Sequence, residues 1–176
     1  MSDIICSGFG GQGILTSGLI LAKIAMEEGL EVTWIPSYGS EMRGGTANCA
    51  VKIDRLPVAS PFVGAVDLLI AMNTPSVEKF EPMMRPGGIM AVNSSIVEPG
   101  RAYRADVTVV EVPAGDIADE IKNPRGANLV ALAAGVAKSG LFERDVFIKG
   151  VEKFFSDKGK INPLNAPCLE RGWAAA

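Results

Sequence analysis

Histidine is absent from this chain of 176 residues, and cysteine is scarce. Without histidine, the chain lacks the commonest general base and the commonest zinc ligand. The three cysteines, Cys6, Cys49 and Cys168, stand far apart, so they form neither a C-x-x-C motif nor a disulfide framework. We expect Cys6 and Cys49 to be small buried residues within strands, and the role of Cys168 is open. Neither a self-contained hydrolase nor a carrier of iron–sulfur clusters is expected.

Basic patches and long apolar runs are also missing. The net charge is −3, the pI is about 5.1 and no basic stripe carries interleaved aromatic residues, so we expect no nucleic-acid binding. The longest apolar runs, such as residues 65–72, are far too short to span a bilayer. The start, Met1-Ser2-Asp3, has no positively charged region of a signal peptide. We therefore expect a cytoplasmic protein that does not enter a membrane.

Hydrophobic residues make up 48% of the chain, enough for a single domain over residues 1–176. Short apolar runs typical of strands alternate with longer runs typical of helices. This alternation predicts an α/β fold, a Rossmann-like three-layer domain with a mostly parallel sheet. The predicted strands are 4–6, 31–35, 46–54, 65–73, 89–93 and 107–112. The predicted helices are 14–28, 74–84 capped by Thr74, a short helix capped by Asp116, 127–138, 142–158, and a C-terminal helix or arm that carries Trp173.

A glycine-rich turn joins the first predicted strand to the first predicted helix. Gly8, Gly10 and Gly13 match the pattern G-x-G-x-x-G, in which backbone N–H groups and a helix N-terminus approach an anion. A dinucleotide site would also need an acidic residue at the end of the second strand, and that strand ends in Pro36-Ser37-Tyr38. Two interpretations stay open, because the glycines either bind an anion or only let the helix pack closely on the sheet.

The second predicted strand leads into a polar, glycine-rich loop over residues 37–45. In a parallel sheet the first two strands would be neighbours, so both loops would meet at one rim and form a composite site. Arg43 is either a charge-assisted donor to a phosphate, or it pairs with Glu41 or caps a chain end within this subunit. We predict no catalytic residue and no metal ligand. The candidate binding residues are Gly8, Gly10, Gly11, Gln12, Gly13, Thr16, Tyr38, Ser40, Glu41, Arg43 and Gly44.

A third segment, residues 123–128 with the sequence Asn-Pro-Arg-Gly-Ala-Asn, precedes the apolar helix 127–138. Pro124 and Gly126 break the chain, and Asn128 is expected to cap the helix that follows. The functional alternative is that Asn123, Arg125 and Asn128 contact another subunit.

Taken together, the segments 8–13, 36–45 and 123–128 resemble one family over nearly the whole chain: the gamma subunit, or gamma domain, of 2-oxoacid:ferredoxin and related 2-oxoacid:acceptor oxidoreductases. The resemblance implies one subunit of an enzyme that oxidatively decarboxylates pyruvate, 2-oxoglutarate or a branched-chain 2-oxoacid. Such an enzyme passes the acyl group to coenzyme A and the electrons to ferredoxin. Which 2-oxoacid is used stays open, and so does the stoichiometry.

The resemblance also implies where the cofactors lie. Thiamine diphosphate and magnesium belong to the alpha and beta subunits, and iron–sulfur clusters belong to beta or to a ferredoxin-like delta subunit. This chain alone is expected to bind none of them and to be inactive by itself. Its glycine loop would form a wall that contacts coenzyme A or a neighbouring subunit. Two alternatives are a stand-alone nucleotide-binding protein and the small subunit of an indolepyruvate oxidoreductase.

Overall fold

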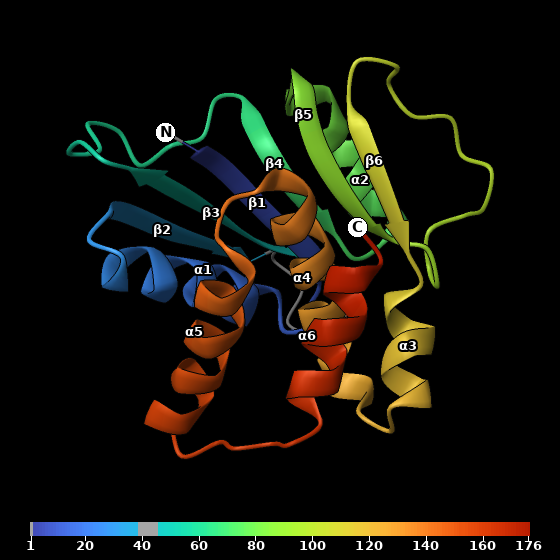
Figure 1. Cartoon of the computed structure of the whole chain (residues 1–176). Helices are drawn as coiled ribbons and strands as arrows, with labels where there is room; N and C mark the ends of the chain where they lie inside the picture. The colour runs from blue at the N-terminus through green and yellow to red at the C-terminus, as the bar shows by residue number, and fades with distance from the viewer. Residues whose placement is uncertain (1, 39–45) are drawn as a thin grey trace.

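The computed structural model describes residues 2–38 and 46–176. Within them, six strands form one sheet in the order β2-β3-β1-β4-β5-β6 (Figure 1). Three of the five strand pairs are parallel, which confirms the α/β class and the mostly parallel sheet. The strands are β1 (Ser2–Phe9), β2 (Glu31–Tyr38), β3 (Thr46–Asp54), β4 (Val66–Ala71), β5 (Met84–Asn93) and β6 (Thr108–Val112).

The position of β3 corrects the expected strand order. β3 lies between β1 and β2 and runs antiparallel to both, so the first two strands are parallel in direction but are not neighbours. The physical reason is the length of the connection. Only residues 39–45 separate β2 from β3, whereas a parallel return needs a crossover of about a dozen residues or more.

Helices cover the two faces of the sheet unequally (Figure 1). On one face α1 contacts β1, β2 and β3, α4 contacts β4, β5 and β6, and α5 and α6 pack outside them. On the opposite face α2 contacts β4 and β1. No helix in the part of the chain that the structure describes is long and apolar enough to cross a membrane. The helices are α1 (Ile14–Glu27), α2 (Thr74–Phe80), α3 (Ala114–Glu120), α4 (Ala127–Ser139), α5 (Arg144–Asp157) and α6 (Asn165–Ala174).

The predicted caps of α2 and α3 are wrong. Asn73, not Thr74, caps α2, because its Oδ1 accepts a hydrogen bond from the Ser76 N–H at 2.9 Å. Asp116 lies inside α3, and its own N–H donates to Ser95 Oγ at 3.0 Å, so a side chain from a neighbouring loop satisfies this end of the helix. Helix 74–84 also ends earlier than predicted, at Phe80, where a short 3₁₀ turn begins.

Residues 85–88, which the sequence predicts as a turn before a strand, lie within β5. The pairing of β5 with β4 changes register there, because Val66 opposes Met84 while Leu68 opposes Ile89. The extra residues of β5 between these two pairs form a bulge, and the strand continues through it.

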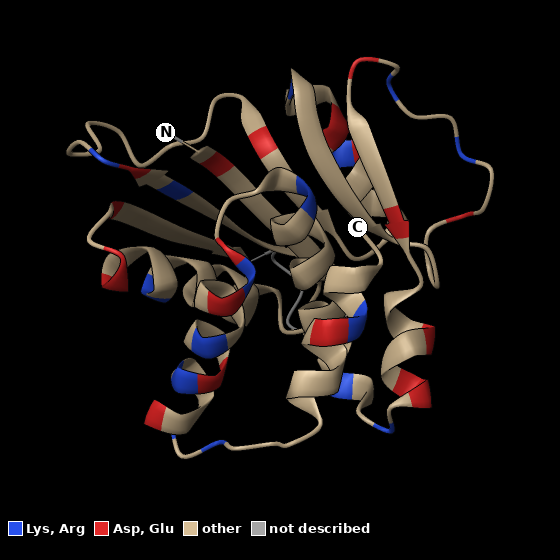
Figure 2. Ribbon diagram, in the orientation of Figure 1, with Lys and Arg blue, Asp and Glu red and all other residues tan. Residues whose placement is uncertain are grey.

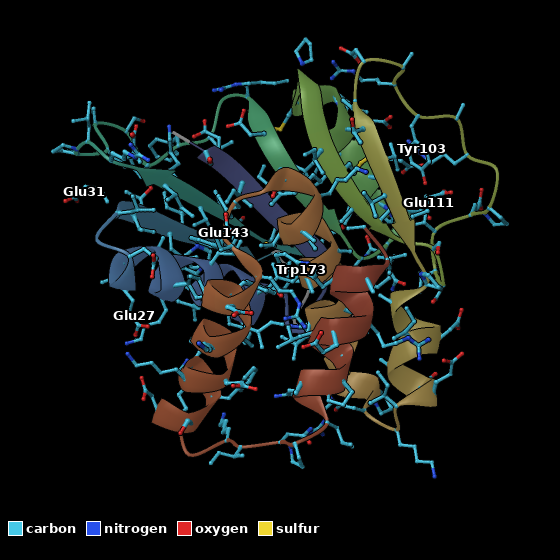
Figure 3. The ribbon with its side chains drawn as sticks, in the orientation of Figure 1. Glu27, Glu31, Tyr103, Glu111, Glu143 and Trp173 are labelled. Atoms are coloured by element: carbon cyan, nitrogen blue, oxygen red, sulfur yellow. The ribbon has the colours of Figure 1, made fainter. Side chains whose placement is uncertain are left out.

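The strap of residues 94–107 completes the cover on the α2 side of the sheet. Glu81 holds it, since its Oε1 accepts from the Arg104 N–H at 2.7 Å and its Oε2 from Arg101 at 3.0 Å. Tyr103, labelled in Figure 3, donates to Glu111 of β6 at 3.1 Å. Burial raises the pKa of Tyr103 to about 12, so this donor keeps its proton at neutral pH.

The small residues of α4 allow close packing on two sides. A Cβ added at Gly135 would clash with Ile70 Cδ1 of the sheet, and one added at Gly172 of α6 would clash with the backbone oxygen of Val130. The C-terminal segment is therefore a docked helix. Trp173 at its end packs on Phe147 of α5 with ring centroids 5.9 Å apart (Figure 3).

We predict that Gly172→Ala destabilises the chain by about 1–3 kcal/mol, because the carbonyl of Val130 belongs to a helix backbone and cannot turn aside. Gly64→Ala is the matched control, since a Cβ there meets no atom within 4 Å, and it should stay within about 0.5 kcal/mol of the parent. Urea denaturation followed by circular dichroism measures both values. Equal midpoints for the two variants would contradict the close packing of α6 on α4.

Candidate anion-binding site

The glycine loop occupies residues 10–13, between the end of β1 at Phe9 and the start of α1 at Ile14. Gly11 and Gly13 have φ angles of +95° and +73°, a region that other residues avoid. A Cβ at Gly13 would also lie 2.8 Å from Asn128 Nδ2. The loop therefore needs glycine at these positions for backbone geometry and for a close approach to α4.

Gln12 closes the loop on itself. Its Oε1 accepts a hydrogen bond from the Phe9 N–H at 2.6 Å, and its own N–H donates to the Phe9 oxygen at 3.2 Å. Gly8 makes room for this arrangement, because a Cβ there would lie 2.6 Å from Gln12 Oε1. Gln12 and Gly8, two of the candidate binding residues, therefore determine the shape of the loop.

Asn128 ties the loop to α4. Its Nδ2 donates to the Gly13 oxygen at 3.2 Å and to Ser17 Oγ at 3.1 Å, and its side chain is buried. The expected capping role of Asn128 is wrong, since no side chain caps the start of α4 and Asn128 is the second residue of that helix. The amide instead fixes the N-terminal turn of α1 against a helix that is more than 100 residues away in the sequence.

A hollow of about 340 Å³ lies beside the loop and draws its walls from three parts of the chain. Arg125 and Lys160 line it, and neither side chain has an acidic partner among residues 2–38 and 46–176. Figure 2 shows basic residues and no acidic ones along the connection from α5 to α6, which includes Lys160. Unpaired cations beside backbone N–H groups at a helix start favour an anionic ligand. The lining residues are Gly11, Gly13, Thr16, Asn123, Arg125, Asn128, Leu129, Phe155, Lys160, Asn162 and Asn165.

Asn123 holds the far wall of the hollow together. Its Nδ2 donates to Asn165 Oδ1 at 3.1 Å and to Cys168 Sγ at 3.6 Å, and its Oδ1 accepts from Asn162 at 3.3 Å. These bonds join the end of α3 to the start of α6. Cys168 is thus a buried hydrogen-bond acceptor, and burial raises the pKa of its thiol, which keeps it protonated.

A second hollow, of about 320 Å³, lies against the same loop. It is lined by Phe9, Gly10, Gly11, Gly13, Ile14, Leu15, Thr16 and Ala47. Gly11, Gly13 and Thr16 face both hollows, so these predicted site residues are brought together.

The ends of three strands meet at this rim. Phe9 of β1 pairs with Thr46, and Tyr38 of β2 pairs with Ala47, so the loop after β1 and the loop after β2 leave from one place although β3 separates the two strands. Ser40, Glu41, Arg43 and Gly44 lie outside the described residues, and only the backbone of Tyr38 is described. Their roles stay predictions.

Sequence reasoning missed one side of the hollow. Lys160, Asn162 and Asn165 come from the end of the chain, where Asn-Pro-Leu-Asn has the composition of an ordinary connection and no periodic signal. It also missed that Arg125 faces the glycine loop, because the pattern of residues 123–128 indicates only helix punctuation or a subunit contact.

The profile of the pyruvate ferredoxin/flavodoxin oxidoreductase family matches residues 3–175. The chain belongs to this family. It is 39% identical over 172 residues to the ketoisovalerate oxidoreductase subunit VorA of Methanothermobacter marburgensis, which covers 96% of this chain and 35% of the relative. It is 32% identical over 151 residues to the 2-oxoglutarate synthase subunit KorC of Methanocaldococcus jannaschii, which covers 85% and 81%. The chain therefore spans only about a third of the length of VorA.

Solved structures of the family share the fold. The gamma subunit of a keto/oxoacid ferredoxin oxidoreductase from Geobacter sulfurreducens superposes with a TM-score of 0.82 at 25% identity, over 100% of this chain and 98% of that chain. A 2-oxoglutarate:ferredoxin oxidoreductase from Magnetococcus marinus, solved with 2-oxoglutarate, coenzyme A and succinyl-CoA bound, superposes with a TM-score of 0.85 at 25% identity. There the match covers 99% of this chain but 31% of the other, so the same fold also occurs as one part of a longer chain.

We predict that Asn128→Ala lowers the free energy of unfolding by about 1–3 kcal/mol, because the half-buried Gly13 oxygen and the buried Ser17 hydroxyl both lose a donor. Hydrogen exchange of the amides of residues 10–17 should quicken at the same time. Asn48→Ala is the control: Asn48 is half-buried, makes no side-chain hydrogen bond within the described chain, and should change stability by less than about 0.5 kcal/mol. Unchanged exchange in residues 10–17 would show that Asn128 does not hold the loop.

Proposed function

We propose that this chain is the gamma-type subunit of a multi-subunit 2-oxoacid:ferredoxin oxidoreductase, which converts a 2-oxoacid to acyl-CoA and delivers electrons to ferredoxin. Family membership supports this proposal, as does the match to nearly the full length of a gamma subunit. The similar relatives are named for different 2-oxoacids, ketoisovalerate and 2-oxoglutarate, so membership of the family does not identify the substrate. An indolepyruvate oxidoreductase would need the same kind of small subunit.

The reacting cofactors are assigned to partner subunits in this proposal. Within the described residues no group of three or more His, Cys, Asp and Glu side chains could hold a metal ion, and the cysteines are not clustered as iron–sulfur ligands are. Thiamine diphosphate with its magnesium would then lie on the alpha and beta subunits, and the clusters on beta or delta. The role left for this chain is assembly and part of the binding site for coenzyme A.

The single observation that carries the coenzyme A assignment is the hollow beside the glycine loop. Arg125 and Lys160 stand there without acidic partners in the described structure, in a chain whose net charge is −3. Coenzyme A carries a pyrophosphate and a 3′-phosphate, and charge-assisted hydrogen bonds are the strong means of holding such groups. Gly11, Gly13 and Thr16 line the same hollow, and they carry backbone N–H groups and a hydroxyl that can donate to a phosphate. Arg43, in the loop after β2, is proposed as a further donor from the same rim.

A stand-alone dinucleotide-binding protein is the second candidate, and the topology disfavours it. In the Rossmann fold the second strand lies beside the first and ends in the acid that binds the ribose. Here β1 lies between β4 and β3, and β3, which runs in the opposite direction, occupies the side where the second strand would lie; β2 ends in Pro36-Ser37-Tyr38. Titration of the purified chain with NAD, NADP and FAD should show no binding.

We predict that Arg125→Ala and Lys160→Ala each raise the KM for coenzyme A of the assembled enzyme about 10-fold or more, since each removes a hydrogen bond to a charged group. The rate at saturating coenzyme A and the KM for the 2-oxoacid should stay unchanged. Lys138→Ala, at the exposed end of α4 and outside the hollow, is the matched control.

Dephospho-coenzyme A, which lacks the 3′-phosphate but keeps the pyrophosphate, shows which phosphate each side chain binds. The ratio of its KM to that of coenzyme A is measured for each variant. If a variant loses discrimination against it, that side chain holds the 3′-phosphate; if the ratio is kept, it holds the pyrophosphate. Arg43→Ala tests the second loop in the same assay. A KM for coenzyme A that is unaltered in Arg125→Ala, Lys160→Ala and Arg43→Ala would overturn the assignment.

A further inference from the structure

Cys6 and Cys49 lie directly opposite each other on β1 and β3. Opposed residues of an antiparallel pair point to the same face, and their Cα atoms are about 4.5–5.5 Å apart, which is inside the range that a disulfide spans. Both thiols are free, fully buried and part of the same core cluster beneath α1. The register of β3 therefore makes a cross-strand dithiol from two cysteines that are scattered in the sequence.

The two thiols lie on the same face of the sheet, but their pKa values shift in opposite directions. Hydrogen bonding between them raises the pKa of Cys6, which burial raises further, whereas the same bond lowers the pKa of Cys49. The thiolate is the attacking species, and Cys49 is the thiol that lies beside the buried indole nitrogen of Trp34, so we assign Cys49 as the nucleophile and Cys6 as the resolving thiol.

Cys49 lies beside a hydrogen-bond donor that has no partner among the described residues. A Cβ added at Gly18 would clash with its Sγ and would lie 2.9 Å from Nε1 of Trp34, so the sulfur and the indole nitrogen share one pocket. That Nε1 is buried and has no hydrogen-bond partner in the described structure. A thiolate or an oxidised sulfur on Cys49 would accept its proton, which the neutral thiol does only weakly. The indole N–H of Trp34 thus stabilises the thiolate and the sulfenic acid of Cys49, the two species that form during oxidation.

We propose that Cys6 and Cys49 form a peroxide-responsive dithiol that closes to a disulfide behind the glycine loop. Cys49 attacks hydrogen peroxide, the O–O bond breaks, water leaves and a sulfenic acid forms. Cys6 then displaces the hydroxyl group as a second water, and the S–S bond forms. Two thiols lose two electrons and two protons in total, and one peroxide becomes two waters. Only an oxidant as small as peroxide suits a pair this deeply buried.

The disulfide would act on the glycine loop. Cys49 Sγ donates to the backbone oxygen of Ile14, in the first turn of α1, at 3.5 Å. Oxidation removes this hydrogen bond to the first turn of α1. It also links β1 to β3 covalently at Cys6, two residues before Gly8, so the contacts that hold the glycine loop change on both sides. This proposal does not depend on the identity of the ligand that the loop binds.

The test uses the full-length chain, treated with hydrogen peroxide, denatured in an alkylating reagent and analysed by intact mass and peptide mapping. We expect a loss of two hydrogens, one alkylated thiol at Cys168, and a linked peptide pair that contains Cys6 and Cys49. Dithiothreitol should restore all three thiols. Cys168→Ala should form the same link, and Cys6→Ala and Cys49→Ala should form none.

Trp34→Phe provides the sharper arm, because it keeps an aromatic ring and removes the N–H donor. The rate of disulfide formation should fall severalfold in this variant, while the end product stays the same. Three alkylated thiols after peroxide treatment of the parent chain would overturn the proposal, and so would a link that includes Cys168.

Discussion

The connection between β2 and β3 is the constraint on which the rest of the structure depends. It is too short for a parallel crossover, so β3 turns back antiparallel and enters the sheet between β2 and β1. Three consequences follow from this one insertion. The loops after β1 and β2 leave from a single rim. The strand beside β1, which in a Rossmann fold runs parallel to it and ends in the ribose-binding acid, is here the antiparallel β3. Cys49 of β3 comes to lie opposite Cys6 of β1.

Amide side chains build the candidate site around the rim. Asn128 fixes the loop, and Asn123 with Asn162 and Asn165 fixes the opposite wall. Because amides are neutral, they satisfy backbone and side-chain groups without pairing with Arg125 and Lys160. Acidic side chains in the same places would have neutralised these cations. The two cations therefore stay without acidic partners in the described structure, which is the charge that the proposed phosphate ligand would need.

Local signals decide which parts of the fold the sequence predicts correctly. The strand 46–54 has the predicted bounds because a period of two is a local property. Gly29 and Gly140 follow the ends of α1 and α4, where left-handed backbone favours glycine. Asn73 and Ser95 escape prediction, since the side chain that satisfies a helix end can come from the next residue or from a separate loop. The register break in β5 escapes it for the same reason, because it depends on how β4 pairs with it.

The sequence by itself determined the fold class, the glycine loop and the absence of a dinucleotide acid, since composition, periodicity and the need for glycine at positive φ are all written in neighbouring residues. Only the tertiary structure decided that Arg125 and Lys160 share a hollow with Gly11 and Thr16, and that the two scattered cysteines form a pair. These juxtapositions join segments that lie far apart in the chain. They depend on strand order and helix packing, which no short stretch of sequence encodes.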